Sequence, residues 1–244
     1  MRLAPPPAAD VLADHVRERG YASAPGVLSS ASCVRLRREC ERIVSALLPR
    51  PGGAPRMEPR LHGWNLPTGE AYAFKVKPVA DLSPPIAALA DHPLLRAILA
   101  RLLRGAPRLV EDKLMLKQRL PDGAARGGWP VLGPEVHRHI DGVYFERRGL
   151  SSDVVSSAFV LDDCAADSGP LRVWPGSHRH SIPLEDGGPH GPVVPDRAAP
   201  EADAVELVVP AGSLLLWHSR LVHASRDNRS GRPRRLVVFG HDHE

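Results

Sequence analysis

The order of the predicted elements indicates an α+β protein that is mainly β, with helices first and an antiparallel jelly roll after them. Two observations predict this class. Helical periodicity is confined to the first 105 residues, and about eight short strand candidates follow, with turn residues and no long helix between them. A chain of 244 residues can bury one large core. We therefore expect a single domain over 1–244, with a mainly helical buttress and lid in 1–105 and the jelly-roll core in 106–244.

Two helices are predicted near the N-terminus. Residues 9–19 form a short helical segment that Gly20 closes. The stronger pattern follows Ser29 and Ser30, either of which can cap a helix. Its apolar residues recur every three or four positions, which is the spacing of one helix face. These residues are Cys33, Leu36, Cys40, Ile43, Val44 and Leu47.

The remaining elements are predicted from helix-breaking prolines and glycines and from short apolar stretches. Residues 49–71 are rich in proline and glycine and predict a loop. Residues 84–105 predict a helical stretch that breaks near His92 and Pro93, because a residue before proline disfavours the helical conformation. The strand candidates that follow are, in order, "RLVEDKLMLKQRL", "VHRHIDGVYFE", "DVVSSAFVLDD", "GPLRVWPG", "AVELVVPAG", "SLLLWHS", "LVHASR" and "RRLVVFG".

Composition argues against several classes of function. No apolar run approaches the roughly 18–20 residues of a membrane span, and the opening "MRLAPPPAAD" lacks the apolar core of a secretion signal. We therefore expect a cytoplasmic location and no membrane partner. The net charge of +4 rests on scattered arginines with few aromatic residues among them, so no nucleic-acid partner is expected. The cysteines Cys33, Cys40 and Cys164 lack zinc-like spacing and predict buried thiols in a reducing compartment.

The stretch "PEVHRHIDGVYFE" (134–146) carries the first candidate site. If it is a strand, His137, His139 and Asp141 leave the same face. An imidazole and a carboxylate on one face suit two adjacent positions on a metal, although the same pair could form a surface ion pair. A third ligand would come from His218 or His223. Two histidines and one carboxylate leave three open positions on octahedral iron(II), where a co-substrate and O2 can bind together.

Two later stretches carry a resemblance to a known family. "GPLRVWPGSHR" (169–179) contains a PGSH turn, and "HASRDNRSGRPRR" (223–235) follows the pattern H-x-S-x-x-N-x-S-x-x-x-R. With the earlier HxD motif, this order resembles the phytanoyl-CoA dioxygenase family of iron(II)/2-oxoglutarate oxygenases. The resemblance implies a double-stranded β-helix (the cupin-like jelly roll) with the N-terminal helices packed on one sheet. It also implies that the metal ligands and catalytic residues are His139, Asp141 and His223.

The resemblance further implies a binding site for 2-oxoglutarate. Arg234 would pair with the distal carboxylate of this co-substrate, and Ser225 on the strand beside it would hydrogen-bond the same carboxylate. A planar carboxylate suits the fixed fork of an arginine. Relatives often place a polar contact to 2-oxoglutarate where Lys117 and Gln118 stand, and strand alternation puts Lys113, Met115 and Lys117 on one face. The cofactors implied are Fe(II), 2-oxoglutarate and O2.

Several residues are candidates for contact with a substrate. His137 would lie at the rim of the pocket or behind the metal ligands, unless it is simply exposed to solvent. Tyr144 would line the pocket if the chain bends at Gly142, and Trp64 could pack on an apolar substrate. For Trp217 the sequence indicates instead an aromatic side chain in the core or the barrel wall. We expect three segments to form a lid over the site, and the first of them brings Lys75 and Lys77 nearby. These segments are 56–75, 121–135 and 182–203.

The sequence therefore predicts an Fe(II)/2-oxoglutarate-dependent dioxygenase that hydroxylates an unactivated C–H bond of a small molecule. The GC-rich composition favours a role in bacterial natural-product biosynthesis. Because Asp141 fills the position that related halogenases leave small, halogenation is disfavoured. Desaturation, epoxidation or ring formation would need the same cofactors, and a non-catalytic cupin-like binding protein is a further alternative. We expect a monomer or a homodimer.

Overall fold

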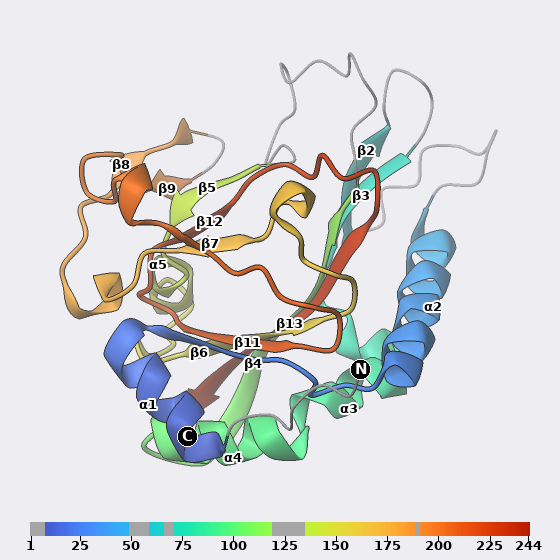
Figure 1. The fold of residues 1–244 in the computed structure, drawn as a ribbon, viewed down its shortest axis with the longest axis horizontal. Coiled ribbons are helices and arrows are strands. Elements are labelled where there is room, and N and C mark those ends of the chain that lie inside the picture. The colour runs from blue at the N-terminus through green and yellow to red at the C-terminus, as the bar shows by residue number, and fades with distance from the viewer. Residues whose placement is uncertain (1–7, 49–58, 66–70, 119–134, 189–190) are drawn as a thin grey trace.

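Two antiparallel sheets face each other and enclose the interior of a barrel (Figure 1). The structure is a computed structural model, and it describes residues 8–48, 59–65, 71–118, 135–188 and 191–244. The larger sheet contains, in spatial order, β1 (Tyr21–Ala24), β11 (Leu214–His218), β6 (Val155–Val160), β13 (Arg234–His243), β4 (Pro107–Lys117), β3 (Ala71–Val76) and β2 (Leu61–Asn65). The smaller sheet contains β10 (Val205–Glu206), β7 (Leu171–Val173), β12 (His223–Ser225) and β5 (Val136–His139).

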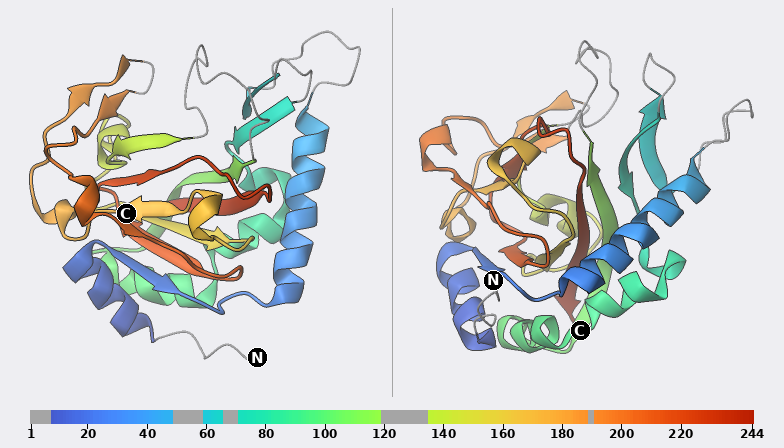
Figure 2. Two further views of the ribbon diagram at one scale, coloured as in Figure 1. Left: turned by 45° about the horizontal axis from the view of Figure 1, so that its top comes forward. Right: turned by 45° about the vertical axis from the view of Figure 1, so that its right-hand side comes forward.

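The helices lie mostly against the outer face of the larger sheet (Figure 2). They are α1 (Ala9–Arg19), α2 (Ser30–Leu47), α3 (Pro84–Ala90) and α4 (Pro93–Leu102), with the short α5 (Gly142–Glu146) beside β5. Within the described residues, single 3-10 turns lie at Ala80–Leu82, Ala166–Ser168, Ser177–Arg179 and Glu201–Asp203, and β8 (Glu185–Asp186) pairs with β9 (Pro192–Val193). No helix in the described ranges is long and apolar enough to span a bilayer.

The two N-terminal helices and the break in the third helical stretch form where the sequence predicts them. The Ser29 hydroxyl accepts a hydrogen bond from the Ser32 backbone N–H at 3.1 Å, which satisfies an otherwise unpaired donor in the first turn of α2. Gly20 ends α1 in the left-handed conformation with φ of 86°. His92 separates α3 from α4, and Pro93 occupies the first turn of α4, where its missing N–H leaves no partner unsatisfied.

Strand alternation divides the core into two layers. On β4 and β13, Leu114, Leu116, Val237 and Phe239 face outward and pack against the helices. Met115, Leu236 and Val238 face inward, between the two sheets. The residues on β4 that share the inward face with Met115 therefore line the interior of the barrel, as the alternation predicts.

Two sequence expectations about local structure are wrong. The segment 49–71 was expected to be a loop, but it contains β2, which pairs with β3 and extends the larger sheet. The strand expected over 136–146 ends at His139, and α5 follows it. The β-branched and aromatic residues of this segment favour a strand locally. Tertiary contacts override that preference, because the Gly142 N–H donates to the Ser219 carbonyl at 2.9 Å and Phe145 is buried.

Candidate metal and co-substrate centre

Three predicted ligands come together at the mouth of the barrel. His139 is the last residue of β5 and lies directly opposite His223, the first residue of β12. Asp141 precedes the first turn of α5. One ligand atom from each of the three lies within 4.8 Å of the others, and Asp141 approaches the Nε2 atoms of both histidines at 3.6 Å. The alternative ligand His218 lies elsewhere, with its ring 5.4 Å from that of His178.

Both imidazoles are oriented for metal binding through Nε2. His139 Nδ1 lies 2.8 Å from the His137 carbonyl, and His223 Nδ1 lies 3.0 Å from the Leu221 carbonyl. With the proton on Nδ1, each ring donates to its carbonyl and turns a free Nε2 lone pair toward Asp141. The three side chains would hold a metal ion between them, because the Asp141 carboxylate lies 3.6 Å from the Nε2 atoms of both histidines. The donor set fits the two-histidine, one-carboxylate arrangement of iron(II) oxygenases.

Asp141 is held by two neighbours that the sequence did not reveal as part of the site. Trp217 Nε1 donates to Asp141 Oδ2 at 3.1 Å, and the Ser156 hydroxyl donates to the same oxygen at 3.3 Å. These two residues lie opposite each other on β11 and β6. The only sequence signal was that a buried indole N–H needs an acceptor. Trp217 therefore contacts a candidate ligand, whereas the sequence suggested only barrel-wall packing.

Burial and neighbouring charges give the ligands the protonation states that a metal requires. Burial, together with the nearby His139, lowers the pKa of His223 to about 4, so its imidazole is neutral at physiological pH. Burial would raise the pKa of Asp141, but His223, His139 and Lys113 outweigh it and hold that pKa well below its ordinary value. A neutral imidazole and an ionised carboxylate are the metal-binding forms of these side chains.

A second feature of the barrel is a pair of buried cations on neighbouring strands of the larger sheet. Arg234 on β13 pairs directly with Lys117 on β4, and the two residues are only 3% and 1% exposed. Neither forms an ion pair within the described part of the chain, and Arg234 Nε has no hydrogen-bond partner there. Burial and the adjacent Arg234 hold the pKa of Lys117 well below its ordinary value. Two opposed buried cations with an unpaired donor form a site for an anion such as the distal carboxylate of 2-oxoglutarate.

The other residues predicted to bind the co-substrate are Ser225 and Gln118. Ser225 is buried on β12, in the smaller sheet, whereas Arg234 is on β13 in the larger one. The expectation that these residues sit on adjacent strands is therefore wrong, and they belong to facing sheets. Gln118 follows the end of β4 and lines a hollow together with Cys40 of α2, on the helix side of the sheet. Lys117 and Arg234 border the same hollow, and strand alternation places Lys117 on the inward face with Met115.

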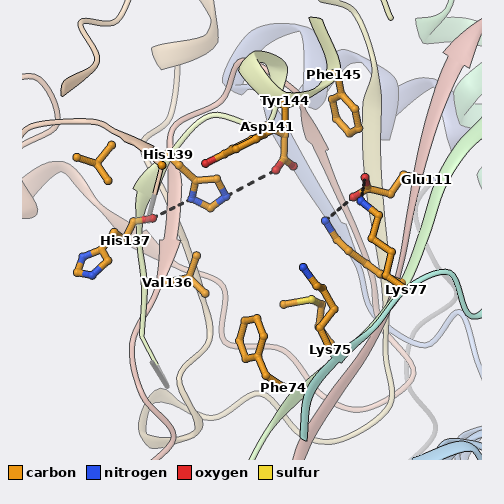
Figure 3. A pocket seen from close by; sticks show the side chains of 14 residues that line it. Phe74, Lys75, Lys77, Glu111, Val136, His137, His139, Asp141, Tyr144 and Phe145 are labelled. Atoms are coloured by element: carbon orange, nitrogen blue, oxygen red, sulfur yellow. Dashed lines mark hydrogen bonds and ion pairs between the residues drawn. The ribbon is translucent and has the colours of Figure 1, made fainter. Parts of the chain in front are cut away.

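A cavity of about 360 Å³ adjoins the candidate metal ligands (Figure 3). Tyr144 lines it, because the chain bends into α5 at Gly142. His137 also reaches the cavity, but its ring points away from His139 and Asp141, so its contribution near His139 is the backbone carbonyl (Figure 3). The side chain of Trp64 and most of the expected lid segment 121–135 lie outside the described residues. The segment 182–203, which was expected to form part of a lid, contributes Gly191 and Val193 to the cavity wall. Phe74 and Lys75, from the expected lid segment 56–75, line the cavity from strand β3.

The family model for phytanoyl-CoA dioxygenase (PhyH) matches residues 16–236. The chain belongs to this family. Its members are Fe(II)/2-oxoglutarate-dependent oxygenases, so the predicted family is confirmed. A curated relative, the L-proline trans-4-hydroxylase of Streptomyces griseoviridis, is 29% identical over 181 residues. That match covers 65% of this chain and spans 63% of the relative's length, which is less than two thirds.

Solved structures share the fold. EctD from S. alaskensis, solved with 2-oxoglutarate and 5-hydroxyectoine, has a TM-score of 0.73 and 19% identity, covering 100% of this chain and 78% of its own. The epimerase SnoN, solved with Fe3+, alpha ketoglutarate and nogalamycin RO, has a TM-score of 0.71 and 20% identity, covering 96% of this chain and 83% of its own. The predicted jelly-roll class is therefore confirmed.

Proposed function

We propose that this protein is an Fe(II)/2-oxoglutarate-dependent dioxygenase that hydroxylates an unactivated C–H bond of a small molecule in bacterial natural-product biosynthesis. The observation that carries the proposal is the pairing of two sites in one barrel. One is the group of His139, Asp141 and His223, with both Nε2 atoms turned toward the carboxylate. The other is the buried pair of Arg234 and Lys117, two cations without a protein anion among the described residues.

Each part of the chain has a role in this reaction. His139, Asp141 and His223 would hold iron(II), and Arg234 with Lys117 would bind the distal carboxylate of 2-oxoglutarate. When bound, the metal and the co-substrate supply an oxidant from O2, with release of succinate and CO2. Trp217 and Ser156 both donate to Asp141 Oδ2, which orients the carboxylate and leaves Oδ1 directed to His139.

Succinate formation tests the proposal. Purified protein is supplied with Fe(II) and 2-oxoglutarate, and succinate is measured under air and under nitrogen. We expect turnover that depends on O2, at a low uncoupled rate without substrate. A protein that binds both ligands but forms no succinate under air, alone or with any candidate substrate, would be the non-catalytic binding protein that the sequence left open.

Two histidine variants test the ligand assignment. His223→Ala removes a ligand and should weaken Fe(II) binding more than about 100-fold, since even residues behind the ligands contribute 10–100-fold. His137→Ala is the matched control, because the contact that orients His139 comes from the His137 backbone carbonyl, which alanine retains. We expect a change of less than about threefold in Fe(II) affinity for this control. Equal losses in the two variants would show that the ligand set is wrong.

The proposal also includes the type of reaction, the cellular location and the oligomeric state. The related folds include an epimerase and the carbocyclase SnoK, so products of candidate substrates should be examined for mass loss as well as for the gain of one oxygen. A cytoplasmic location and a monomeric or homodimeric state are also proposed, and light scattering of the purified protein would measure the latter.

A further inference from the structure

A buried thiol lies against the guanidinium assigned to the co-substrate. The side chains of Cys164 and Arg234 share a hydrogen bond, in which the guanidinium donates and the sulfur accepts. The two residues are only 1% and 3% exposed. Cys164 belongs to the apolar layer between the sheets, and Arg234 shares the inward face of β13 with Leu236 of the same layer. The sequence predicted Cys164 only as a buried thiol, and the proposed function gives it no role.

The backbone holds the thiol in place. The Cys164 N–H donates to the Val209 carbonyl at 2.9 Å, and the Val209 N–H donates to the Cys164 carbonyl at 3.1 Å. These two hydrogen bonds join the chain after β6 to the chain before β11. A cysteine on a fixed backbone has a single side-chain torsion to its sulfur, whereas an arginine has several torsions, each with its own rotamers. The sulfur is therefore a fixed acceptor that can select one orientation of the longer side chain.

The thiol holds Arg234 without neutralising its charge. Burial raises the pKa of the Cys164 thiol above its ordinary value and outweighs the opposing effect of Arg234, so the thiol is neutral at physiological pH. A carboxylate at the same place would form an ion pair with Arg234 and compete with a bound anion. With a neutral acceptor the positive charge remains available, and Arg234 Nε has no hydrogen-bond partner among the described residues.

We propose that Cys164 is a positioning residue for the co-substrate, whose sulfur holds the Arg234 guanidinium in the orientation that binds the distal carboxylate of 2-oxoglutarate. This assignment rests on the proposed function, because it adds a residue to the same co-substrate site. Cys164 acts through Arg234 and not by contact with the co-substrate. A guanidinium that is oriented before the ligand arrives loses less conformational entropy on binding, so the contribution of Cys164 appears in the affinity for 2-oxoglutarate.

A packing role alone is the alternative for Cys164, and the chain offers a matched control. Cys33 on α2 is also 1% exposed, and a Cβ at Gly212 would lie 3.7 Å from its sulfur. Cys33→Ala and Cys164→Ala remove the same atom from equally buried positions, so lost packing should lower the stability to urea by similar amounts. Cys164→Ser keeps a hydrogen-bond acceptor at its position, whereas Cys164→Val keeps the approximate volume without an acceptor.

Co-substrate binding separates the two roles. Parent and variants are loaded with Fe(II) without oxygen and titrated with 2-oxoglutarate, and the charge-transfer absorption of the complex reports binding. We expect Cys164→Ala and Cys164→Val to raise the Kd about fivefold or more, and Cys164→Ser and Cys33→Ala to stay within about twofold of the parent. A second titration uses 2-oxopentanoate, in which a methyl group replaces the distal carboxylate. Its Kd should be the same in every variant, because this ligand does not engage Arg234.

Several results would overturn the assignment while leaving the dioxygenase function intact. An unchanged Kd for 2-oxoglutarate in Cys164→Ala and Cys164→Val would show that Arg234 needs no support from the thiol. Equal losses for 2-oxoglutarate and 2-oxopentanoate, or an equal loss in Cys33→Ala, would show general damage to the barrel. An equal loss in Cys164→Ser would exclude the hydrogen bond as the cause. A parent protein that binds Fe(II) but not 2-oxoglutarate would instead refute the proposed function, and the assignment with it.

Discussion

Replacing Glu111 with glutamine tests the ion-pair cluster that forms one wall of the cavity. Glu111 is 9% exposed and accepts from Lys77, Lys113 and Arg148. Burial would raise its pKa, but Lys113 and Lys77 outweigh burial and lower the pKa from 4.5 to about 2. At about 1.4 kcal/mol per pH unit, this difference corresponds to about 3 kcal/mol of folding free energy at neutral pH. We expect Glu111→Gln to lower the free energy of unfolding by about that amount at pH 7.

The pH dependence gives a second measure of the same effect. Because the folded-state pKa is lowered, the stabilisation is fully present above pH 4.5 and is lost as the pH falls from 4.5 toward 2. Urea denaturation at several pH values between 7 and 3 should therefore show the difference between parent and variant shrinking below pH 4.5. Glu18→Gln, at an exposed position of α1, is the matched control and should change stability by less than about 0.5 kcal/mol. Equal stabilities of Glu111→Gln and the control at pH 7 would refute the reasoning.

Three further substitutions test the metal and co-substrate sites. Trp217→Phe keeps the buried ring but removes the donor to Asp141 Oδ2, so Fe(II) affinity, measured by anaerobic titration, should fall about 10- to 100-fold. Arg234→Lys keeps the charge but removes the planar fork, so the Kd for 2-oxoglutarate should rise about tenfold or more while Fe(II) affinity stays the same. Lys117→Met removes one of two opposed buried cations, so the metal-free protein should be at least as stable to urea as the parent, while 2-oxoglutarate binds more weakly.

The helical part of the fold was largely predictable, because its signals are local. Caps, prolines and a repeat of three to four residues lie within a few positions of the elements they define. The buried face of α2, at Cys33, Leu36, Cys40 and Ile43, agrees with the predicted periodicity. The same local reasoning missed β2, because a strand at the edge of a sheet depends on a partner, here β3, that a single sequence window does not contain.

The spacing of His139 and Asp141 identified both as candidate ligands, but the continuous strand expected there is not what brings them together. His139 and Asp141 were expected on one face of a continuous strand. They do converge, but the strand ends at His139 and the turn into α5 brings Asp141 to the site. The supporting donors Trp217 and Ser156 were not predictable, because they lie 76 and 15 residues from Asp141 in sequence and meet it only through the sheet register.

Strand β4 shows how the alternation of side chains along one strand arranges residues in the barrel interior. Its inward face presents Glu111, Lys113, Met115 and Lys117 in order along the barrel. Successive inward side chains lie about 6.6 Å apart along the strand, and each has a different partner. Glu111 and Lys113 neutralise each other at the cavity wall, Met115 lies opposite Lys75, and Lys117 lies opposite Arg234. A shift of one residue in register would turn all four side chains toward the helices. The apolar residues between them pack against those helices and therefore also fix the register of the charged residues.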